Sequence, residues 1–381
     1  MCPRQVLHTT NMRHLIKNLI VALVFYQQFV EIQSKTKCVG ESGEYVDWYI
    51  VYKLPKIRES DFYYVKEGLG YAYMDENKRQ FAMIDKPISS DKSAVGRTLQ
   101  QIYQSRYKVN GLSPGNIQSR HVGYVMYNDA KPEEHGSSFY GHTKGDLAFD
   151  GTSGFWLVHS VPKFPPYADE YYDYPESGKR YGQSFLCVSF NYSMFNEIAL
   201  QLLYNGPQKY DYYLPDVMAS DLPNMKKVVE GKYWYGQPYA HVSKLHSIGG
   251  MTYISFAKNK NFDSDLYSSL VAPFYATDLL AETWQNGESK LKSNCSEYSV
   301  ENVNEVKVCD NHFKETDDHS KWAISKSLET NAVCIGDINR MESQFKRGGG
   351  TLCTENMETW REFRKSILSY ESCDVNYDQV I

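Results

Sequence analysis

The feature that most constrains the fold of this 381-residue chain is a short segment that occurs twice. One copy places His142 two residues before Lys144, and the other places His319 two residues before Lys321. Side chains two positions apart in a β-strand point to the same face of the sheet. Each segment can therefore present an imidazole and an ammonium group together. The matched pairs predict two half-sites that face a shared anion, such as a phosphodiester.

The first pair begins a pattern that is typical of a β-hairpin. Two apolar runs flank a Gly-rich turn at residues 150–154. If the turn is centred near Gly151, His142 lies opposite His159 across the ladder. We therefore expect His159 to support the site, although turn placement fixes a register only to within a residue or two. The alternative for His159 is an ordinary hydrogen-bonded strand residue.

The second pair begins a similar pattern. Two apolar runs flank a polar stretch at residues 327–331. If that turn is centred on Glu329, His319 lies opposite Asn339. Each half would then offer a histidine, a lysine and one further polar side chain, which is Asn339 in this half.

The length of the chain fits one large unit built from two related halves. No low-complexity tract or linker-like stretch interrupts it. We expect an α+β fold in which each half builds a β-sheet flanked by helices, and the halves pack about a pseudo-twofold axis. The N-terminal half would cover about residues 38–225, with His142 and Lys144. The C-terminal half would cover about residues 226–375, with His319 and Lys321.

The N-terminus resembles a secretory signal peptide. Arg13 and Lys17 precede an apolar run at residues 19–26, which is too short to cross a bilayer. We expect residues 1–34 to be removed, and Met12 is an alternative start. An amphipathic or buried helix is the other interpretation, but polar residues end the apolar run abruptly. No other apolar stretch of the sequence is long enough to span a membrane.

Secretion gives the cysteines a structural meaning. The chain has eight cysteines, and Cys2 would leave with the signal peptide. The odd number that remains implies bridges and one spare thiol in an oxidising compartment. Asn191 and Asn294 begin glycosylation sequons. No CxxC pair or carboxylate cluster has metal-ligand spacing, so we expect neither a metal nor another cofactor. The remaining cysteines are Cys38, Cys187, Cys295, Cys309, Cys334, Cys353 and Cys373.

The net charge of the chain affects the pH at which it could bind a polyanion. The formal charge of the whole chain is −5 at pH 7 with histidines neutral. Protonation of histidine, which has a reference pKa of about 6.5, makes the chain less negative in acid. A polyanion would therefore be repelled at neutral pH and tolerated at acidic pH.

Ten ordered segments carry a resemblance to the deoxyribonuclease II family, within the phospholipase D superfamily. They are spread between Cys38 and Cys373 and include both His-x-Lys pairs. The segments are residues 46–55, 94–99, 127–129, 141–145, 154–162, 164–166, 181–184, 318–322, 336–340 and 347–353.

The sequence departs from the wider phospholipase D motif, which has Asp seven residues after the histidine. Phe149 and Lys326 stand at these two positions. The segment from Gly336 to Asn339 keeps the Gly and Asn of the last motif element, whereas His159 stands where the first half would have its Asn. These departures are similar to the nuclease family and argue against phospholipid chemistry.

The resemblance implies three disulfides, and it leaves Cys309 free. It also implies an acid endodeoxyribonuclease that needs no metal and leaves 3′-phosphate and 5′-hydroxyl ends, in the lysosome or secreted. The implied substrate is double-stranded DNA, contacted through its backbone without sequence preference. The implied bridges are Cys38–Cys187, Cys295–Cys373 and Cys334–Cys353.

The four paired residues can support phosphodiester hydrolysis. Lys144 and Lys321 would stabilise charge on the non-bridging oxygens. One of His142 and His319 would attack phosphorus to give a phosphohistidine, and the other would protonate the leaving oxygen and then activate water. The sequence does not decide which histidine attacks. Rival interpretations are another phosphodiesterase of the same fold and a non-catalytic secreted DNA-binding glycoprotein.

Overall fold

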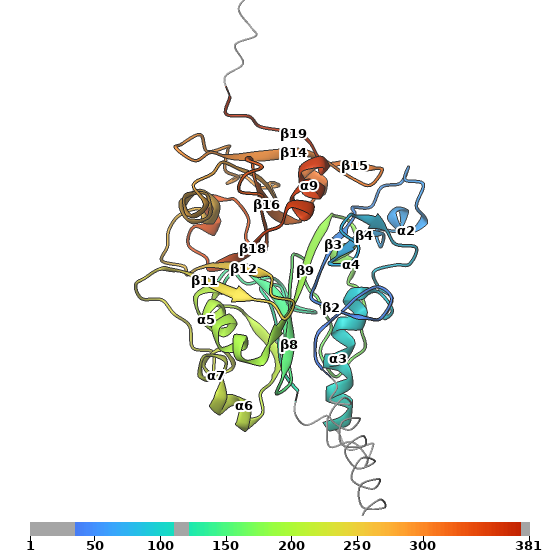
Figure 1. The fold of residues 1–381 in the computed structure, drawn as a ribbon, viewed down its shortest axis with the longest axis vertical. Helices are drawn as coiled ribbons and strands as arrows, with labels where there is room; N and C mark the ends of the chain where they lie inside the picture. Colours follow the sequence, from blue (N-terminus) through green and yellow to red (C-terminus); the bar gives the residue numbers. More distant parts are fainter. Residues whose placement is uncertain (1–34, 110–121, 375–381) are drawn as a thin grey trace, which may run out of the picture. The chain divides into compact units, whose positions relative to one another are not determined.

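The computed structural model describes residues 35–109 and 122–374, with the side chains of residues 106–109 left out. The expected signal peptide at residues 1–34 and the alternative start at Met12 lie outside the described residues. Two large β-sheets form the centre of the structure, and helices flank them (Figure 1). The expected α+β class with a sheet in each half is confirmed.

The first sheet has eight strands in the order β10-β6-β7-β8-β9-β3-β4-β5. Its inner strands are rich in aromatic and β-branched residues, and those from β6 to β8 are buried along their whole length. The strands are β3 (Trp48–Lys53), β4 (Tyr71–Asp75), β5 (Ala82–Met83), β6 (Gly123–Asn128), β7 (Lys144–Phe149), β8 (Ser153–His159), β9 (Gln183–Asn191) and β10 (Lys209–Tyr213). A short ribbon of β1 (Cys38–Val39) and β2 (Tyr45–Val46) stands apart.

The second sheet has nine strands. Eight follow the order β11-β12-β18-β17-β16-β13-β14-β15, and β19 pairs with β14 outside this path. The strands are β11 (Ala240–His246), β12 (Thr252–Lys258), β13 (Leu279–Thr283), β14 (Val300–Val308), β15 (Asn311–Lys314), β16 (Lys321–Ser325), β17 (Ala332–Gly336), β18 (Gly349–Glu355) and β19 (Ile367–Tyr370).

A run of five antiparallel strands occurs in both sheets. The path β6-β7-β8-β9-β3 in the first sheet matches β13-β16-β17-β18-β12 in the second. A helix follows the fourth strand of each path, α5 (Phe195–Asn205) after β9 and α9 (Met357–Ser366) after β18. The two His-x-Lys pairs lie at the same place in this repeat, at the start of β7 and of β16.

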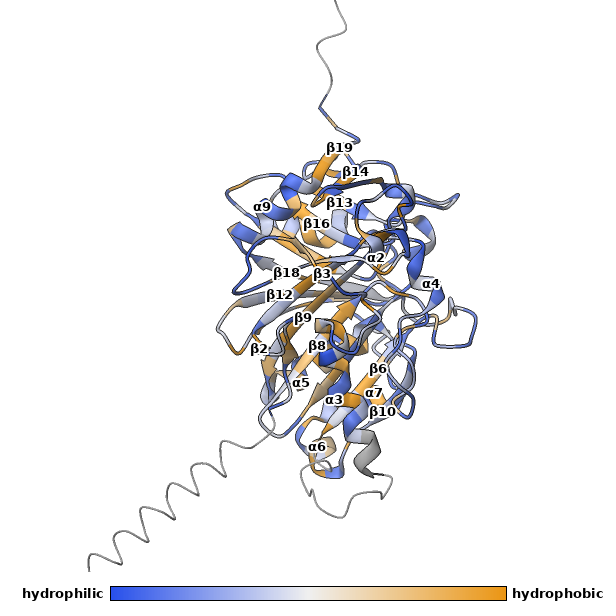
Figure 2. Ribbon diagram, turned by 90° about the vertical axis from the view of Figure 1, so that its right-hand side faces the viewer, coloured by the Kyte–Doolittle hydropathy of each residue, from blue (hydrophilic) through white to orange (hydrophobic). Residues whose placement is uncertain are grey.

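The helices divide the apolar side chains into three clusters. Helix α3 (Ala94–Val109) covers one face of the first sheet, and the turn η3 (Tyr267–Val271) with α8 (Ala272–Tyr275) covers one face of the second. The third and largest cluster joins both sheets with α5 and α9, so the halves share a core. The strands of both sheets are largely apolar in Figure 2. The remaining helices are α2 (Tyr63–Lys66), α4 (Glu176–Lys179), α6 (Asp216–Asp221) and α7 (Pro223–Val229).

Local signals in the sequence explain where α5 and α9 end and begin. Asn356 caps α9 by accepting a hydrogen bond from the backbone N–H of Thr359 at 2.9 Å. Gly206 ends α5 in the left-handed conformation, with φ of 61°, which glycine adopts without steric cost. No helix within residues 35–109 and 122–374 combines the length and apolar character that a membrane span requires.

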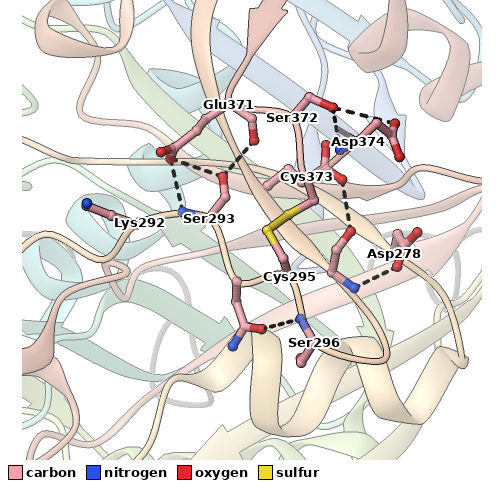
Figure 3. Close-up of a disulfide and its surroundings, with 12 residues drawn as sticks. Asp278, Lys292, Ser293, Cys295, Ser296, Glu371, Ser372, Cys373 and Asp374 are labelled. Carbon is pink, nitrogen blue, oxygen red and sulfur yellow. Dashed lines mark hydrogen bonds between the residues drawn. A yellow bond between two sulfur atoms is a disulfide. The ribbon is translucent and has the colours of Figure 1, made fainter. Parts of the chain in front are cut away.

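Three disulfides join the pairs that the family resemblance implies, and Cys309 is a free thiol. Cys38–Cys187 ties β1 to β9, and Cys334–Cys353 joins the neighbouring strands β17 and β18. Figure 3 shows Cys295–Cys373, which fastens the end of the described chain beside Ser293 and Glu371.

Candidate active site

The first His-x-Lys pair is held by residues of the C-terminal half. His142 is buried just before β7, and its backbone N–H donates to the carbonyl of Gly348 at 2.8 Å. The carboxylate of Asp337 accepts from the hydroxyl of Thr143 and, at 3.2 Å, from the backbone N–H of Lys144. The strand that presents this pair is therefore positioned from across the boundary between the halves.

The second pair is held in the same way by the N-terminal half. The backbone N–H of His319 donates to the carbonyl of Gly182 at 2.9 Å, and that of Lys321 donates to the hydroxyl of Ser184 at 3.1 Å. The ring nitrogen Nδ1 of His319 lies 3.1 Å from Oε1 of Gln183. Each half thus supplies one pair and holds the other.

The two pairs lie in one electrostatic cluster. Burial and the positive charges of Lys144, Arg347 and Lys321 hold the pKa of His142 well below its usual value. Burial, Lys321 and Lys144 depress the pKa of His319 likewise. Burial also lowers the pKa of Lys321, and the charge of Lys144 adds to this effect. A buried group of cations with depressed pKa values is the arrangement expected of a phosphate site.

Asp129, which follows β6 directly, lies in the candidate site, although the sequence analysis did not single it out by itself. Its carboxylate lies 2.5 Å from Nζ of Lys144, 3.1 Å from Nη2 of Arg347 and 3.7 Å from Nε2 of His142. Burial opposes ionisation of Asp129, but the charges and hydrogen bonds of Lys144 and Arg347 lower its pKa overall. Asp129 therefore stays ionised and fixes the direction of both cations.

Aromatic side chains enclose His319. The indole ring of Trp284 meets the imidazole edge to face, with ring centroids 4.9 Å apart. Tyr181 packs against the same indole, with ring centroids 4.7 Å apart. These rings limit the rotation of His319 and remove water from its side, which agrees with its depressed pKa.

The register of the first hairpin differs from the sequence prediction. Gly145 pairs with Val158, so the ladder brings Lys144, and not His142, toward His159. His159 is fully buried, and its Nδ1 accepts from the backbone N–H of Val161 at 3.1 Å while its Nε2 lies 3.5 Å from Asp146. Burial raises the pKa of Asp146 and lowers that of His159, which favours the uncharged form of each group.

The register of the second hairpin differs by one residue. Trp322 pairs with Ile335, which directs His319 toward Ile338 instead of Asn339. Asn339 follows β17 in a buried position, and its Oδ1 accepts no hydrogen bond from the described residues. A one-residue shift moves a side chain to the other face of the sheet, so the expected cross-strand pairing of Asn339 does not form.

Asp318 lies beside His319 in the chain but does not orient its imidazole. Its carboxylate accepts from the hydroxyl of Tyr52 and, at 2.8 Å, from the hydroxyl of Ser320. Burial raises the pKa of Asp318 above its usual value. Within residues 35–109 and 122–374, no group of three or more His, Cys, Asp or Glu side chains is arranged to bind a metal.

The two sequons differ in exposure. Asn191 lies on the surface at the end of β9. Asn294 is half-buried next to Cys295, and its side-chain oxygen accepts from the backbone N–H of Ser296 at 2.9 Å. Asn191 is thus the more accessible glycosylation candidate.

Comparison with known proteins identifies the family. A family profile described as deoxyribonuclease II matches residues 37–373. Plancitoxin-1 of Acanthaster planci is 40% identical over 348 residues, covering 90% of this chain and 94% of that protein. Deoxyribonuclease-2-beta of Mus musculus is 37% identical over 364 residues (94% and 98%), and deoxyribonuclease-2 of Caenorhabditis elegans is 37% identical over 357 residues (88% and 93%). The chain therefore belongs to the deoxyribonuclease II family.

Proposed function

We propose that this protein is an acid endodeoxyribonuclease that hydrolyses DNA phosphodiesters without a metal ion. The observation that carries the proposal is that two His-x-Lys pairs from different halves join one buried cluster of cations. The family membership of nearly the whole chain supports DNA as the substrate. The catalytic residues would be His142, Lys144, His319 and Lys321.

The reaction would proceed in two displacements. A ring nitrogen of one neutral histidine attacks phosphorus, and the bond from phosphorus to the 5′ oxygen breaks. The other histidine, protonated, gives its proton to that oxygen and releases a 5′-hydroxyl end. The same histidine then takes a proton from water, which attacks phosphorus and breaks the nitrogen–phosphorus bond. The 3′-phosphate end leaves, and both imidazoles return to their starting states.

Lys144 and Lys321 would provide the positive charge that the transition state needs. Their Nζ atoms are held by Asp129 at 2.5 Å and by the carbonyl of His319 at 2.5 Å, respectively. Fixed donors in a buried site stabilise developing charge without reorganising. These ammonium groups are our reason to expect activity in the absence of a divalent ion.

The depressed pKa values of the histidines predict an acidic optimum. The general acid must be protonated, and burial among cations opposes this step. Lower pH restores the protonated form, and the negative charge of a bound phosphate favours it further. A positive charge on His142 lowers the pKa of His319 further, so one ring can stay neutral and attack while the other is protonated.

An acidic compartment on the secretory route suits this chemistry. The expected signal peptide at residues 1–34, three disulfides and the exposed sequon at Asn191 support a lysosomal or secreted protein. We propose that it degrades DNA from engulfed or dying cells. His159, which the strand pairing brings toward Lys144, and Asn339 would act as supporting residues.

Plasmid digestion tests the proposal. We expect supercoiled plasmid to be nicked and linearised at pH 5 in EDTA, with far less cleavage at pH 8. Phosphate should be found on the 3′ side of the cut. Hydrolysis of phosphatidylcholine without plasmid cleavage would indicate a different phosphodiesterase, and DNA binding without cleavage would refute an enzymatic role.

A further inference from the structure

Two lysines outside the candidate site occupy matching places in the two halves. Lys53 is the last residue of β3 and pairs with Gln183, the first residue of β9. Lys258 is the last residue of β12 and pairs with Gly349, the first residue of β18. Because β3 corresponds to β12 and β9 to β18 in the repeated strand order, the lysines are structural equivalents.

Both lysines are almost completely removed from solvent, with exposed fractions of 0% and 1%. Lys53 donates through Nζ to the carbonyls of Lys179 at 2.7 Å and Tyr181 at 2.6 Å. No carboxylate forms an ion pair with either ammonium group among the described residues. Burying a cation is costly unless hydrogen bonds compensate it, so the carbonyls must be held in a fixed arrangement around each ammonium group.

Lys258 has the same kind of partners. Its Nζ donates to the carbonyls of Gln344 at 2.8 Å, Phe345 at 3.0 Å and Arg347 at 2.7 Å. These three bonds use all three donors of the ammonium group. The burial of Lys258 thus directs its ammonium group into the protein and away from the surface.

The loop that each lysine holds supplies the carbonyl that anchors a catalytic histidine of the other half. Lys53 holds Tyr181, and the next residue, Gly182, accepts from the backbone N–H of His319. Lys258 holds Arg347, and the next residue, Gly348, accepts from the backbone N–H of His142.

The side chains of Tyr181 and Arg347 also reach the surroundings of the histidine in the opposite half. Tyr181 lies in the N-terminal half and packs on Trp284, which contacts His319. Arg347 lies in the C-terminal half and binds Asp129, which lies beside His142 and Lys144. Each lysine therefore fixes both a backbone anchor and a side-chain neighbour of the opposite histidine.

Close packing at the two glycines leaves little freedom for these anchors. A β-carbon on Gly182 would stand 2.3 Å from Oδ1 of Asp318, and one on Gly348 would stand 2.2 Å from the carbonyl oxygen of Asn205. The backbone at both positions approaches the other chain segment as closely as glycine allows. If the loop at Gly182 or at Gly348 were displaced, the histidine bound to its carbonyl, His319 or His142, would move as well.

We propose that Lys53 and Lys258 are positioning residues that act across the boundary between the halves, Lys53 on His319 and Lys258 on His142. The proposal rests on the proposed function only in assigning these histidines to the reaction. Neither lysine would touch DNA. Misplacement of a reacting group by about 1 Å can cost about 100-fold in rate, so the expected effect is on turnover more than on substrate binding.

The charge state of Lys258 agrees with a site that works in acid. Burial lowers its pKa to about 7, against the opposing effects of Asp265 and Asp263 and with a further lowering by Arg347. Lys258 is thus fully charged at pH 5, when all three of its donors are needed. Above neutral pH it loses one donor and the loop loses one anchor.

Lys→Met substitutions test this action across the boundary because methionine reproduces the lysine side chain as far as Cε and has no donor. We expect K53M and K258M each to lower kcat by about 10- to 100-fold, with little change in KM. Lys326→Met is the matched control, since Lys326 pairs with Glu301 and Asp374 away from the site. Urea unfolding reports whether each variant remains folded.

Histidine NMR distinguishes positioning from a general loss of structure. Imidazole signals would be assigned with H142N and H319N variants and titrated without DNA. We expect K53M to shift the titration of His319 more than that of His142, and K258M to do the reverse. Equal shifts in both histidines, or folded variants with unchanged titrations and kcat, would overturn the proposal.

If a methionine variant does not fold, K53R and K258R take its place. Arginine keeps the charge, but its planar fork directs its donors differently from the ammonium group. The same crossed pattern of shifts is expected, with a smaller loss of kcat. Because the titrations use no DNA, their outcome is independent of whether the protein proves to be a deoxyribonuclease.

Discussion

Asp129→Asn isolates the contribution of the carboxylate that pairs with Lys144 and Arg347. The substitution keeps the size of the side chain and removes its charge. Lys144 and Arg347 then lose a partner that lies 2.5 Å and 3.1 Å away, and both are mostly buried. Removing one member of a buried ion pair typically costs about 3–5 kcal/mol, so we expect a loss of that order in the free energy of unfolding.

The pH dependence of this loss has a definite sign. Because the folded pKa of Asp129 lies below its usual value, its charge stabilises the protein above the unfolded pKa of about 3.9. That stabilisation is lost as the pH falls through the folded pKa. Urea unfolding should therefore show a full difference between wild type and D129N at pH 5 and pH 7, and a smaller one near pH 3.

Activity should respond in a second, independent way. The charge of Asp129 raises the pKa of His319 and of Lys321, so its removal lowers both further. We expect the alkaline limb of the plasmid-cleavage profile to move toward acid.

The exposed Asp61 provides the control, and D61N should change neither quantity. A D129N protein with wild-type stability would show that the ion cluster contributes nothing to folding. A profile that stays in place, or moves toward alkaline pH, would refute the electrostatic account of the acidic optimum.

Three further outcomes follow from the site. H142A and H319A should each lose at least about 100-fold in kcat, and the double variant should lose little more. Acid-quenched wild type should carry phosphohistidine. Activity that is abolished by EDTA and restored by magnesium would contradict this mechanism. K321A should reduce kcat strongly with a small change in KM, measured on plasmid at pH 5, and an effect confined to KM would limit Lys321 to substrate binding. H159A should reduce activity less than H142A. It should also lower the free energy of unfolding in urea by about 1–3 kcal/mol, because Asp146 loses its neighbouring imidazole. A large loss of kcat at unchanged stability would place His159 in the reaction.

The fold class and the paired site were open to prediction because their signals are local. A His-x-Lys pair at the start of an apolar run fixes which face of a strand carries the cations. Repetition of that run implies a repeated sheet. The order of strands could not be predicted, because it depends on contacts between residues far apart in the chain. In particular, the pattern of residues does not show that β3 and β12 are the last strands of the two matching runs.

The support around the site was harder to predict. Asp129 stands in a short polar segment, and its contacts with Lys144 and with Arg347, 218 residues later, appear only in the folded structure. Gln183 reaches His319 across the boundary between the halves for the same reason. The positions of His159 and Asn339 were misjudged because turn composition does not define register to the single residue that decides a face.

The distribution of the disulfides has a consequence for limited proteolysis. Cys38–Cys187 lies wholly before the segment 230–239, and both other bridges lie wholly after it. That segment is largely exposed between α7 and β11. A protease cut there would give two fragments that separate in denaturant without reductant. In native buffer the shared apolar core would keep the nicked fragments associated, so gel filtration and denaturing electrophoresis of the same sample would report different sizes.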